Sequence, residues 1–236
     1  PNPKQGDVTP IDFSPQGARN LKMGADNRTF SKKVFIETYG CQMNVYDTEL
    51  VHSILAKANY ALVSREDEAD VVLLNTCAIR EHAHQKVYNR IHEINRGHNP
   101  AGGEAGGHPV IIGILGCMAT NLRTELLENR KLKIDFIAGP DSYKRLPQLI
   151  EEAMQSEIRD TRYEIRKPFD VTLSEFETYS DVYPQRGRGV NAWIAVMRGC
   201  NNFCTFCVVP YTRGRERSRS VENVVEETRR LAEEGF

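Results

Sequence analysis

The sequence has no long apolar run and almost no net charge, and both features limit what the chain can be. None of its apolar runs approaches the roughly 20 residues that a membrane-spanning helix needs, and residues Pro1 to Pro10 lack the basic and then apolar pattern of a secretion signal. We therefore expect a cytoplasmic protein that does not insert into a membrane. Thirty-one Lys and Arg against 32 Asp and Glu give a net charge of -1. No overall positive field indicates a nucleic-acid partner, so any basic surface has to be local.

Six cysteines are present in a chain of 236 residues whose composition is otherwise that of a globular protein. In the absence of a secretion signal, a disulfide framework is the weaker explanation for them. The cysteines therefore favour metal or redox chemistry.

Apolar, β-rich runs alternate with helical patterns from Lys32 onwards. Strands are expected at 34–39, 71–75, 110–115 and 134–138, and helices at 45–58, 79–95, 121–128 and 142–155. Strands and helices that take turns in this way predict an α/β fold with a parallel sheet covered on both faces. Asn44 or Asp47 is expected to cap the first helix.

This pattern divides the chain into four parts. Residues 1–31, rich in Pro, Gly and Asn, are expected to form a flexible N-terminal extension, and residues 32–155 an α/β domain. Residues 156–189 are expected to be a connector with short extended pieces. Residues 190–236 are expected to begin a second domain, which the chain leaves truncated at residue 236, because one strand and one helix cannot bury a core by themselves.

Within these parts, the sequence predicts the structure of five smaller segments. The connector is expected to be extended at 163–165 and 171–173, and the second domain to open with a strand at 191–197, followed by a helix from about 220 to 234. The tract 97–108 contains five glycines. It is expected to be a surface loop, either a tolerated insertion or a lid.

Three of the cysteines lie close together, in the C-x3-C-x2-C run of Cys200, Cys204 and Cys207, just after the expected strand. Three thiolates on one loop can face a single centre, and soft sulfur ligands suit an iron-sulfur cluster or zinc. A closed zinc site normally has a fourth Cys or His at a regular spacing, and no histidine follows Cys207. A four-iron cluster on three cysteines would leave one iron open to a small molecule.

The other three cysteines, Cys41, Cys77 and Cys117, are far apart in the sequence, but each lies just beyond the end of an expected strand. The carboxyl ends of parallel strands share one edge of the sheet, where ligands of open α/β folds usually bind. These cysteines are therefore predicted to converge. The alternative is that they are ordinary buried small residues.

The C-x3-C-x2-C run, with Phe206 just before its third cysteine, resembles the signature of the radical S-adenosylmethionine (SAM) enzymes. The resemblance implies a 4Fe-4S cluster on Cys200, Cys204 and Cys207, with SAM bound to the open iron and cleaved to a 5′-deoxyadenosyl radical. It also implies a βα barrel whose first strand ends at Met197. Phe206 is a candidate SAM contact.

Three further segments, Gly40–Asn44, Asn75–Glu81 and Gly116–Met118, followed by Val208–Gly214, are similar to motifs of the methylthiotransferase family. From about Lys33 to its end, the chain resembles the MiaB-type branch, which acts on tRNA. The resemblance implies a flavodoxin-like N-terminal methylthiotransferase domain that carries a second, auxiliary 4Fe-4S cluster on Cys41, Cys77 and Cys117.

For the reaction, the same resemblance implies conversion of N6-isopentenyladenosine, next to the tRNA anticodon, to its 2-methylthio form. Two SAM molecules and an electron donor such as flavodoxin or ferredoxin are implied with it. Three alternatives stay open: methylthiolation of a ribosomal protein, methylthiolation of threonylcarbamoyl adenosine, and a non-catalytic metal-binding RNA module.

A local basic stretch supplies a candidate RNA contact. Seven arginines and a single acid, Glu216, lie between residues 186 and 219. Arginine pairs with phosphate oxygens and stacks on bases. If the backbone is extended, alternation puts four of them on one side, so these are predicted to face RNA: Arg213, Arg215, Arg217 and Arg219. The alternative is a solvated loop with Glu216 as an internal partner.

Overall fold

The structure is a computed structural model of the chain, and it describes residues 32–78, 81–98, 109–157, 167–187 and 189–236. The expected N-terminal extension, most of the glycine tract and the extended piece at 163–165 lie outside these ranges. No helix in the described ranges has both the length and the apolar character needed to cross a bilayer.

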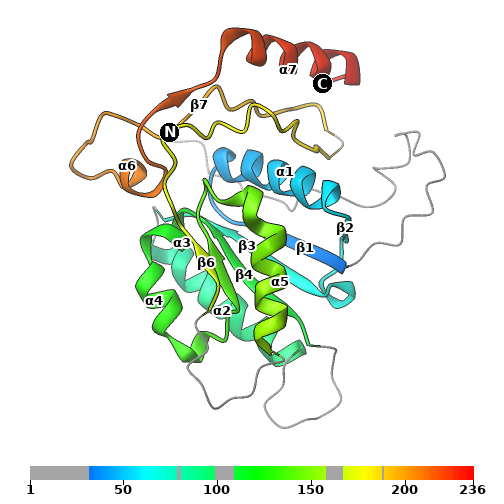
Figure 1. The fold of residues 1–236 in the computed structure, drawn as a ribbon, viewed down its shortest axis with the longest axis vertical. Helices are drawn as coiled ribbons and strands as arrows, with labels where there is room; N and C mark the ends of the chain where they lie inside the picture. Colours follow the sequence, from blue (N-terminus) through cyan, green and yellow to red (C-terminus); the bar gives the residue numbers. More distant parts are fainter. Residues whose placement is uncertain (1–31, 79–80, 99–108, 158–166, 188) are drawn as a thin grey trace, which may run out of the picture.

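Six parallel strands form one sheet in the order β2-β1-β3-β4-β5-β6 (Figure 1). Their bounds are β1 Lys32–Thr38, β2 Tyr60–Leu62, β3 Val71–Thr76, β4 Ile111–Gly116, β5 Phe136–Ala138 and β6 Phe169–Asp170. The first five strands have the flavodoxin-like order. The expected parallel α/β fold is therefore confirmed.

Helices cover both faces of this sheet, and the central strands are buried on both sides as a result. The helices of the sheet domain are α1 Gln42–Lys57, α2 Glu81–His98, α3 Cys117–Asn121, α4 Arg123–Glu128 and α5 Leu146–Glu157, with 3-10 turns η1 Glu66–Glu68, η2 Arg130–Leu132 and η3 Tyr143–Arg145. Alternate residues of β3 enter opposite cores. Val71 and Leu73 pack with α1 and α5, whereas Val72 and Leu74 pack with α2.

Several boundaries differ from the expected ones. The helix expected at 121–128 is two helices, α3 and α4, of which α3 begins at Cys117. The N-cap of α1 is Cys41, without a side-chain hydrogen bond, so the expectation that Asn44 or Asp47 caps this helix is wrong. Both side chains are buried inside the first turns, where they have other partners.

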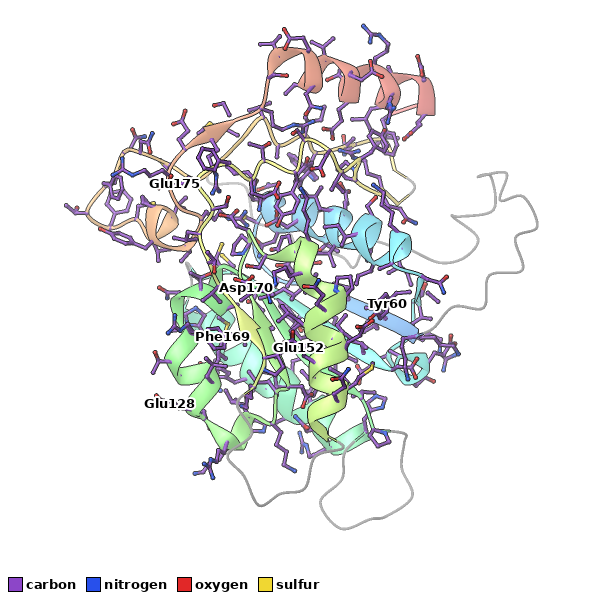
Figure 2. All side chains as sticks on the ribbon, in the orientation of Figure 1. Tyr60, Glu128, Glu152, Phe169, Asp170 and Glu175 are labelled. Atoms are coloured by element: carbon purple, nitrogen blue, oxygen red, sulfur yellow. The ribbon has the colours of Figure 1, made fainter. Side chains whose placement is uncertain are left out.

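The segment expected to be a connector contributes to the sheet domain. It supplies β6, whose two residues, Phe169 and Asp170, are labelled in Figure 2 at the edge of the sheet. Asp170 is buried and accepts a hydrogen bond from Arg145 at 2.7 Å. Farther along, Tyr179 and Val182 join the core beneath α1 and α5. These residues pack on the sheet domain because an aromatic or branched side chain would otherwise expose a large apolar surface.

The last part of the chain contains β7 Met197–Arg198, α6 Val209–Thr212, β8 Arg217–Ser218 and α7 Val221–Glu234. The strand expected at 191–197 is wrong in extent, since only Met197 belongs to β7. This strand pairs with β8 in an antiparallel ladder instead of with a parallel neighbour. In Figure 1, α7 lies at the top of the molecule and α6 lies beside α3.

Candidate metal centre

Three cysteines follow three neighbouring strands at the carboxyl edge of the sheet. Cys77 and Cys117 come directly after β3 and β4, and Cys41 follows β1 after a short turn. The strands are locked in register at this edge, where the Tyr39 N–H donates to the Asn75 carbonyl at 2.8 Å and Thr76 pairs with Gly116. Because α1 and α2 pack on opposite faces, the junction of β1 and β3 is the topological switch point, the usual ligand site of such sheets.

Two glycines bring the cysteine-bearing turns into contact. Gly40 has φ +120°, and a Cβ on it would lie 2.6 Å from Cys77 Cβ and 3.4 Å from Cys77 Sγ. Gly116 has φ +88°, and a Cβ there would lie 2.5 Å from the Thr76 carbonyl oxygen. Any other residue would push the turns apart. The turns that carry Cys41, Cys77 and Cys117 are therefore adjacent, as expected from their positions after strands.

All three of these cysteines are free thiols, and Cys41 is exposed whereas Cys77 and Cys117 are buried. Within the described ranges, no three His, Cys, Asp or Glu side chains are arranged to hold a single metal ion. A four-iron cluster makes a different demand, because each thiolate binds a different iron and the sulfurs lie farther apart. Iron-sulfur clusters are bound by soft thiolates, which Cys41, Cys77 and Cys117 can supply at the carboxyl ends of the strands.

The second group of cysteines lies on the loop between β7 and α6, and backbone contacts fix the loop. The Cys200 N–H donates to the Gly214 carbonyl at 3.1 Å, and the Cys207 N–H donates to the Cys204 carbonyl at 2.9 Å. Gly199, with φ +74°, passes so close to the returning chain that a Cβ on it would lie 2.1 Å from the Arg215 carbonyl oxygen. Cys204 is exposed, so this loop presents sulfur to the surface.

Aromatic side chains surround this loop. Phe203 and Tyr211 meet edge to face with ring centroids 6.0 Å apart, and the Arg215 guanidinium lies 6.0 Å from the Phe203 ring. Phe206 is 92% exposed. Its ring is therefore accessible, one residue before Cys207, and its expected role as a SAM contact stays a prediction.

Arg213 links the two groups of cysteines. It follows α6, yet its Nε donates to Cys117 Sγ at 3.1 Å, and its Nη2 donates to Asp47 Oδ2 at 2.7 Å and to Asn44 Oδ1 at 3.1 Å. Burial raises the pKa of the Cys117 thiol, although the guanidinium of Arg213 opposes this effect. The segment that follows Cys200, Cys204 and Cys207 therefore contacts Cys117 of the other cysteine group through Arg213.

Asp47, on α1, is the acid at the centre of this contact. It is fully buried, and its second carboxylate oxygen accepts a hydrogen bond from Arg198 Nη1 at 2.8 Å. Burial alone would raise the pKa of Asp47, but attraction and hydrogen bonds from Arg198 and Arg213 outweigh burial and lower the pKa below its ordinary value. Sequence reasoning missed the role of this acid, because its arginine partners lie 151 and 166 positions away.

Two further arginines of the basic stretch, Arg217 and Arg219, also pair with acids inside the chain. Arg217 makes a bidentate pair with Asp141, with N–O distances of 2.7 and 3.1 Å, and Arg219 pairs with Glu227 at 2.5 Å. The expected exposed row of Arg213, Arg215, Arg217 and Arg219 is therefore wrong, because desolvated guanidinium groups need carboxylate partners. Arg215 alone of these four is exposed.

Another buried acid, Glu49, lies near Arg186 and Glu227. Its carboxylate approaches Arg186 Nε at 3.4 Å without a hydrogen bond, because Arg186 hydrogen-bonds Glu227 instead. Burial raises the pKa of Glu49 to about 7, Arg186 opposes that effect and Glu227 adds to it. Arg186 of the expected connector therefore joins Glu49 of α1 to Glu227 of α7 in one buried group of charged side chains.

The surroundings of Cys117 fit an anionic group. Three buried arginines, Arg198, Arg213 and Arg217, face two buried aspartates, Asp47 and Asp141, which leaves one positive charge without a carboxylate in this cluster. Arg213 Nη1 is buried and has no hydrogen-bond partner within the described ranges. A cluster held by thiolates is an anion with sulfur acceptors, so the residues present suit it.

Two protein families match separate parts of the chain. Residues 33–139 match the uncharacterized protein family UPF0004, and residues 194–236 match the radical SAM superfamily. The first match covers the sheet edge with Cys41, Cys77 and Cys117, and the second covers the loop with Cys200, Cys204 and Cys207.

Curated relatives match nearly the whole chain. The identity is 45% to a protein of Chloroherpeton thalassium (86% of this chain, 42% of the relative), 44% to one of Porphyromonas gingivalis strain ATCC 33277 (91% and 44%) and 43% to one of Bacteroides fragilis strain ATCC 25285 (92% and 45%). Each of these relatives is named tRNA-2-methylthio-N(6)-dimethylallyladenosine synthase. The chain spans less than half the length of each.

Proposed function

We propose that the chain belongs to the MiaB-type branch of the radical SAM methylthiotransferase family and that its full-length protein converts N6-isopentenyladenosine in tRNA to the 2-methylthio form. The relatives' names supply the substrate and the product. The observation that carries the proposal is the meeting of two cysteine groups across Arg213, which reaches from the loop after Cys207 to the sulfur of Cys117.

Two 4Fe-4S clusters are part of this proposal. Cys200, Cys204 and Cys207 would hold one, and Cys41, Cys77 and Cys117 would hold the auxiliary one. When bound, the first cluster supplies the electron that cleaves SAM, which opens a radical route to the unactivated C2–H bond of adenine. The hydrogen bond from Arg213 to Cys117 supports two neighbouring sites, and the exposed Cys41 and Cys204 would leave both open to reagents.

Phe206 and Arg215 are the proposed contacts for SAM and tRNA. Phe206 offers an exposed ring one residue before Cys207, and Arg215 is the exposed arginine among Arg213, Arg215, Arg217 and Arg219. A reductant such as flavodoxin or ferredoxin would supply electrons. We place the activity in the cytoplasm, where thiols stay reduced.

Iron content tests the assignment of the cysteines. The full-length protein, reconstituted without oxygen, is expected to hold about eight irons per chain, since it would carry two four-iron clusters. Cys77→Ala and Cys204→Ala are each expected to lose about half of that iron, and Phe206→Ala is expected to keep all of it while weakening SAM binding. One zinc per chain would instead support the metal-binding RNA module. Equal iron in Cys77→Ala and the wild type would contradict the auxiliary cluster.

Nucleoside mass spectrometry tests the substrate. Cells that lack the gene are expected to accumulate N6-isopentenyladenosine in tRNA and to recover the 2-methylthio nucleoside with the wild-type gene but not with the Cys77→Ala gene. Loss of methylthiolation from threonylcarbamoyl adenosine or from a ribosomal protein, with isopentenyladenosine methylthiolation intact, would assign the protein to one of the alternatives.

A further inference from the structure

We infer that Arg213 is a positioning residue that raises the reduction potential of the auxiliary cluster by donating N–H groups to its sulfur atoms. This inference rests on the proposed ligation by Cys41, Cys77 and Cys117, and it adds a residue that is not itself a ligand. Arg213 lies on the loop of the other cysteine group, so it also connects the two sites.

The hydrogen bonds of Arg213 show which way its donors face. Nη2 is used by Asp47 and Asn44, which fixes the plane of the guanidinium, and Nε reaches Cys117 Sγ at 3.1 Å. The remaining nitrogen, Nη1, is buried without a partner within the described part of the chain. A buried donor without an acceptor is unfavourable. Sulfur atoms bound beside Cys117 would be acceptors for it.

The charge of the surroundings adds to this effect. Asp47 faces two arginines, Arg198 and Arg213, and the carboxylate of Asp141 is engaged by both oxygens with Arg217. The excess positive charge is buried, so water and salt screen it weakly. It therefore acts on whatever charge is bound at Cys117.

Reduction adds one negative charge to a cluster, and hydrogen bonds and positive charge stabilise the more negative form. Hydrogen bonds to cluster sulfurs and net charge are among the features that set iron-sulfur potentials. Arg213 therefore favours the reduced auxiliary cluster. Since Arg213 follows Cys207 on the same loop, the potential at one site depends on the docking of the loop that carries the other.

The experiment isolates the auxiliary cluster in the full-length protein. A background variant with Cys200, Cys204 and Cys207 all changed to Ala is compared with the same variant carrying Arg213→Gln or Arg213→Lys. Iron per chain is measured first, and the midpoint potential is then measured by a redox titration followed by electron paramagnetic resonance. If the background variant holds no cluster, the proposed function fails at that step, before Arg213 is tested.

Arg213→Gln is expected to lower the ratio of reduced to oxidised cluster roughly tenfold at a fixed potential, a shift of about 59 mV for a one-electron couple. Arg213→Lys keeps a positive charge near Asp47 but loses the Nε–H donor, so we expect a smaller shift in the same direction. Arg217→Gln is the matched control, because Arg217 is also a buried arginine on this segment, but its hydrogen bonds go to Asp141 and to the carbonyls of Ser174 and Arg213 instead of to a sulfur. Arg217→Gln removes one positive charge of the buried cluster but no N–H donor to sulfur, so it is expected to shift the potential less than Arg213→Gln does.

Three results would overturn the inference. One is a wild-type potential in Arg213→Gln with full iron content. Another is an equal shift in Arg217→Gln, which would assign the effect to a loosened loop. If Arg213→Gln does not fold or holds no iron, the Lys variant decides, and a wild-type potential in Arg213→Lys would then contradict the role of the N–H donors.

Discussion

Replacing Asp47 by Asn tests whether one buried carboxylate holds the two cysteine groups together. Asp47 is fully buried and accepts hydrogen bonds from Arg198 at 2.8 Å and from Arg213 at 2.7 Å. The amide keeps the shape of the side chain but leaves two buried guanidinium groups without their counter-charge. Loss of one partner of a buried ion pair costs about 3–5 kcal/mol. With a urea dependence of about 2 kcal/mol per M, the unfolding midpoint should fall by about 2 M.

The effect has a defined pH dependence. The pKa of Asp47 is lowered in the folded state from its ordinary value of 3.8. A lowered pKa contributes stability that is fully present above pH 3.8 and is lost as the pH falls through the folded-state pKa. The difference in free energy of unfolding between wild type and Asp47→Asn should therefore be constant near neutral pH and shrink in acid.

The assay is urea unfolding of the full-length apoprotein, followed by circular dichroism at pH 7 and at pH 3.5. Asp67→Asn is the control, since Asp67 also pairs with an arginine, Arg65, but is exposed. This control should not shift the midpoint measurably. A loss of less than about 1 kcal/mol in Asp47→Asn at pH 7 would refute the reasoning, because it is the value of an exposed pair.

Three further predictions concern Glu49, Gly113 in the sheet and Gly97 in α2. Because burial raises the pKa of Glu49 from 4.5 to about 7, its contribution to stability is full below pH 4.5 and is lost as the pH rises through 7, by about 3 kcal/mol in total. Glu49→Gln should remove this slope from urea midpoints measured between pH 4.5 and 8, and an unchanged slope would contradict the shift. Gly113→Ala should lower the free energy of unfolding by about 1–3 kcal/mol, because the new Cβ would lie 2.3 Å from the ring of Phe136. Gly97→Ala, in α2 with open space around it, should instead raise it by about 0.5–1 kcal/mol, and a loss there would contradict the helical assignment.

Hydrophobic patterning predicted the parts of the fold that are buried on both faces. β3 and β4 are apolar runs with every residue buried, and such runs between helical patterns are recognisable without a structure. The positions of Cys41, Cys77 and Cys117 after strands also followed from the pattern. β2 and β6 did not, because neither of these short strands lies between two helical patterns, as the equally short β5 does.

The partners of the arginines could not be predicted from the sequence. Local charge suggested an exposed row, but Arg213 and Arg198 find their acid on α1, which lies 166 and 151 positions earlier. Nothing in a local pattern shows which acid will be desolvated beside which arginine. The same holds for Arg213 and Cys117, where a helix that follows one cysteine group packs on a helix that begins at the other.

The ion pairs of Asp47 hold the loop with Cys200, Cys204 and Cys207 against the helix that follows Cys41. Arg198 precedes Cys200 and Arg213 follows Cys207, so the two arginines flank the cysteine loop, and both end on the same carboxylate of α1. The helix that carries this carboxylate begins directly after Cys41. An apolar contact could hold the same surfaces together with less desolvation, but it would not fix direction as two planar guanidinium groups do. A charged contact is the arrangement expected where one loop must be held at a set distance from another and must also present positive charge to sulfur.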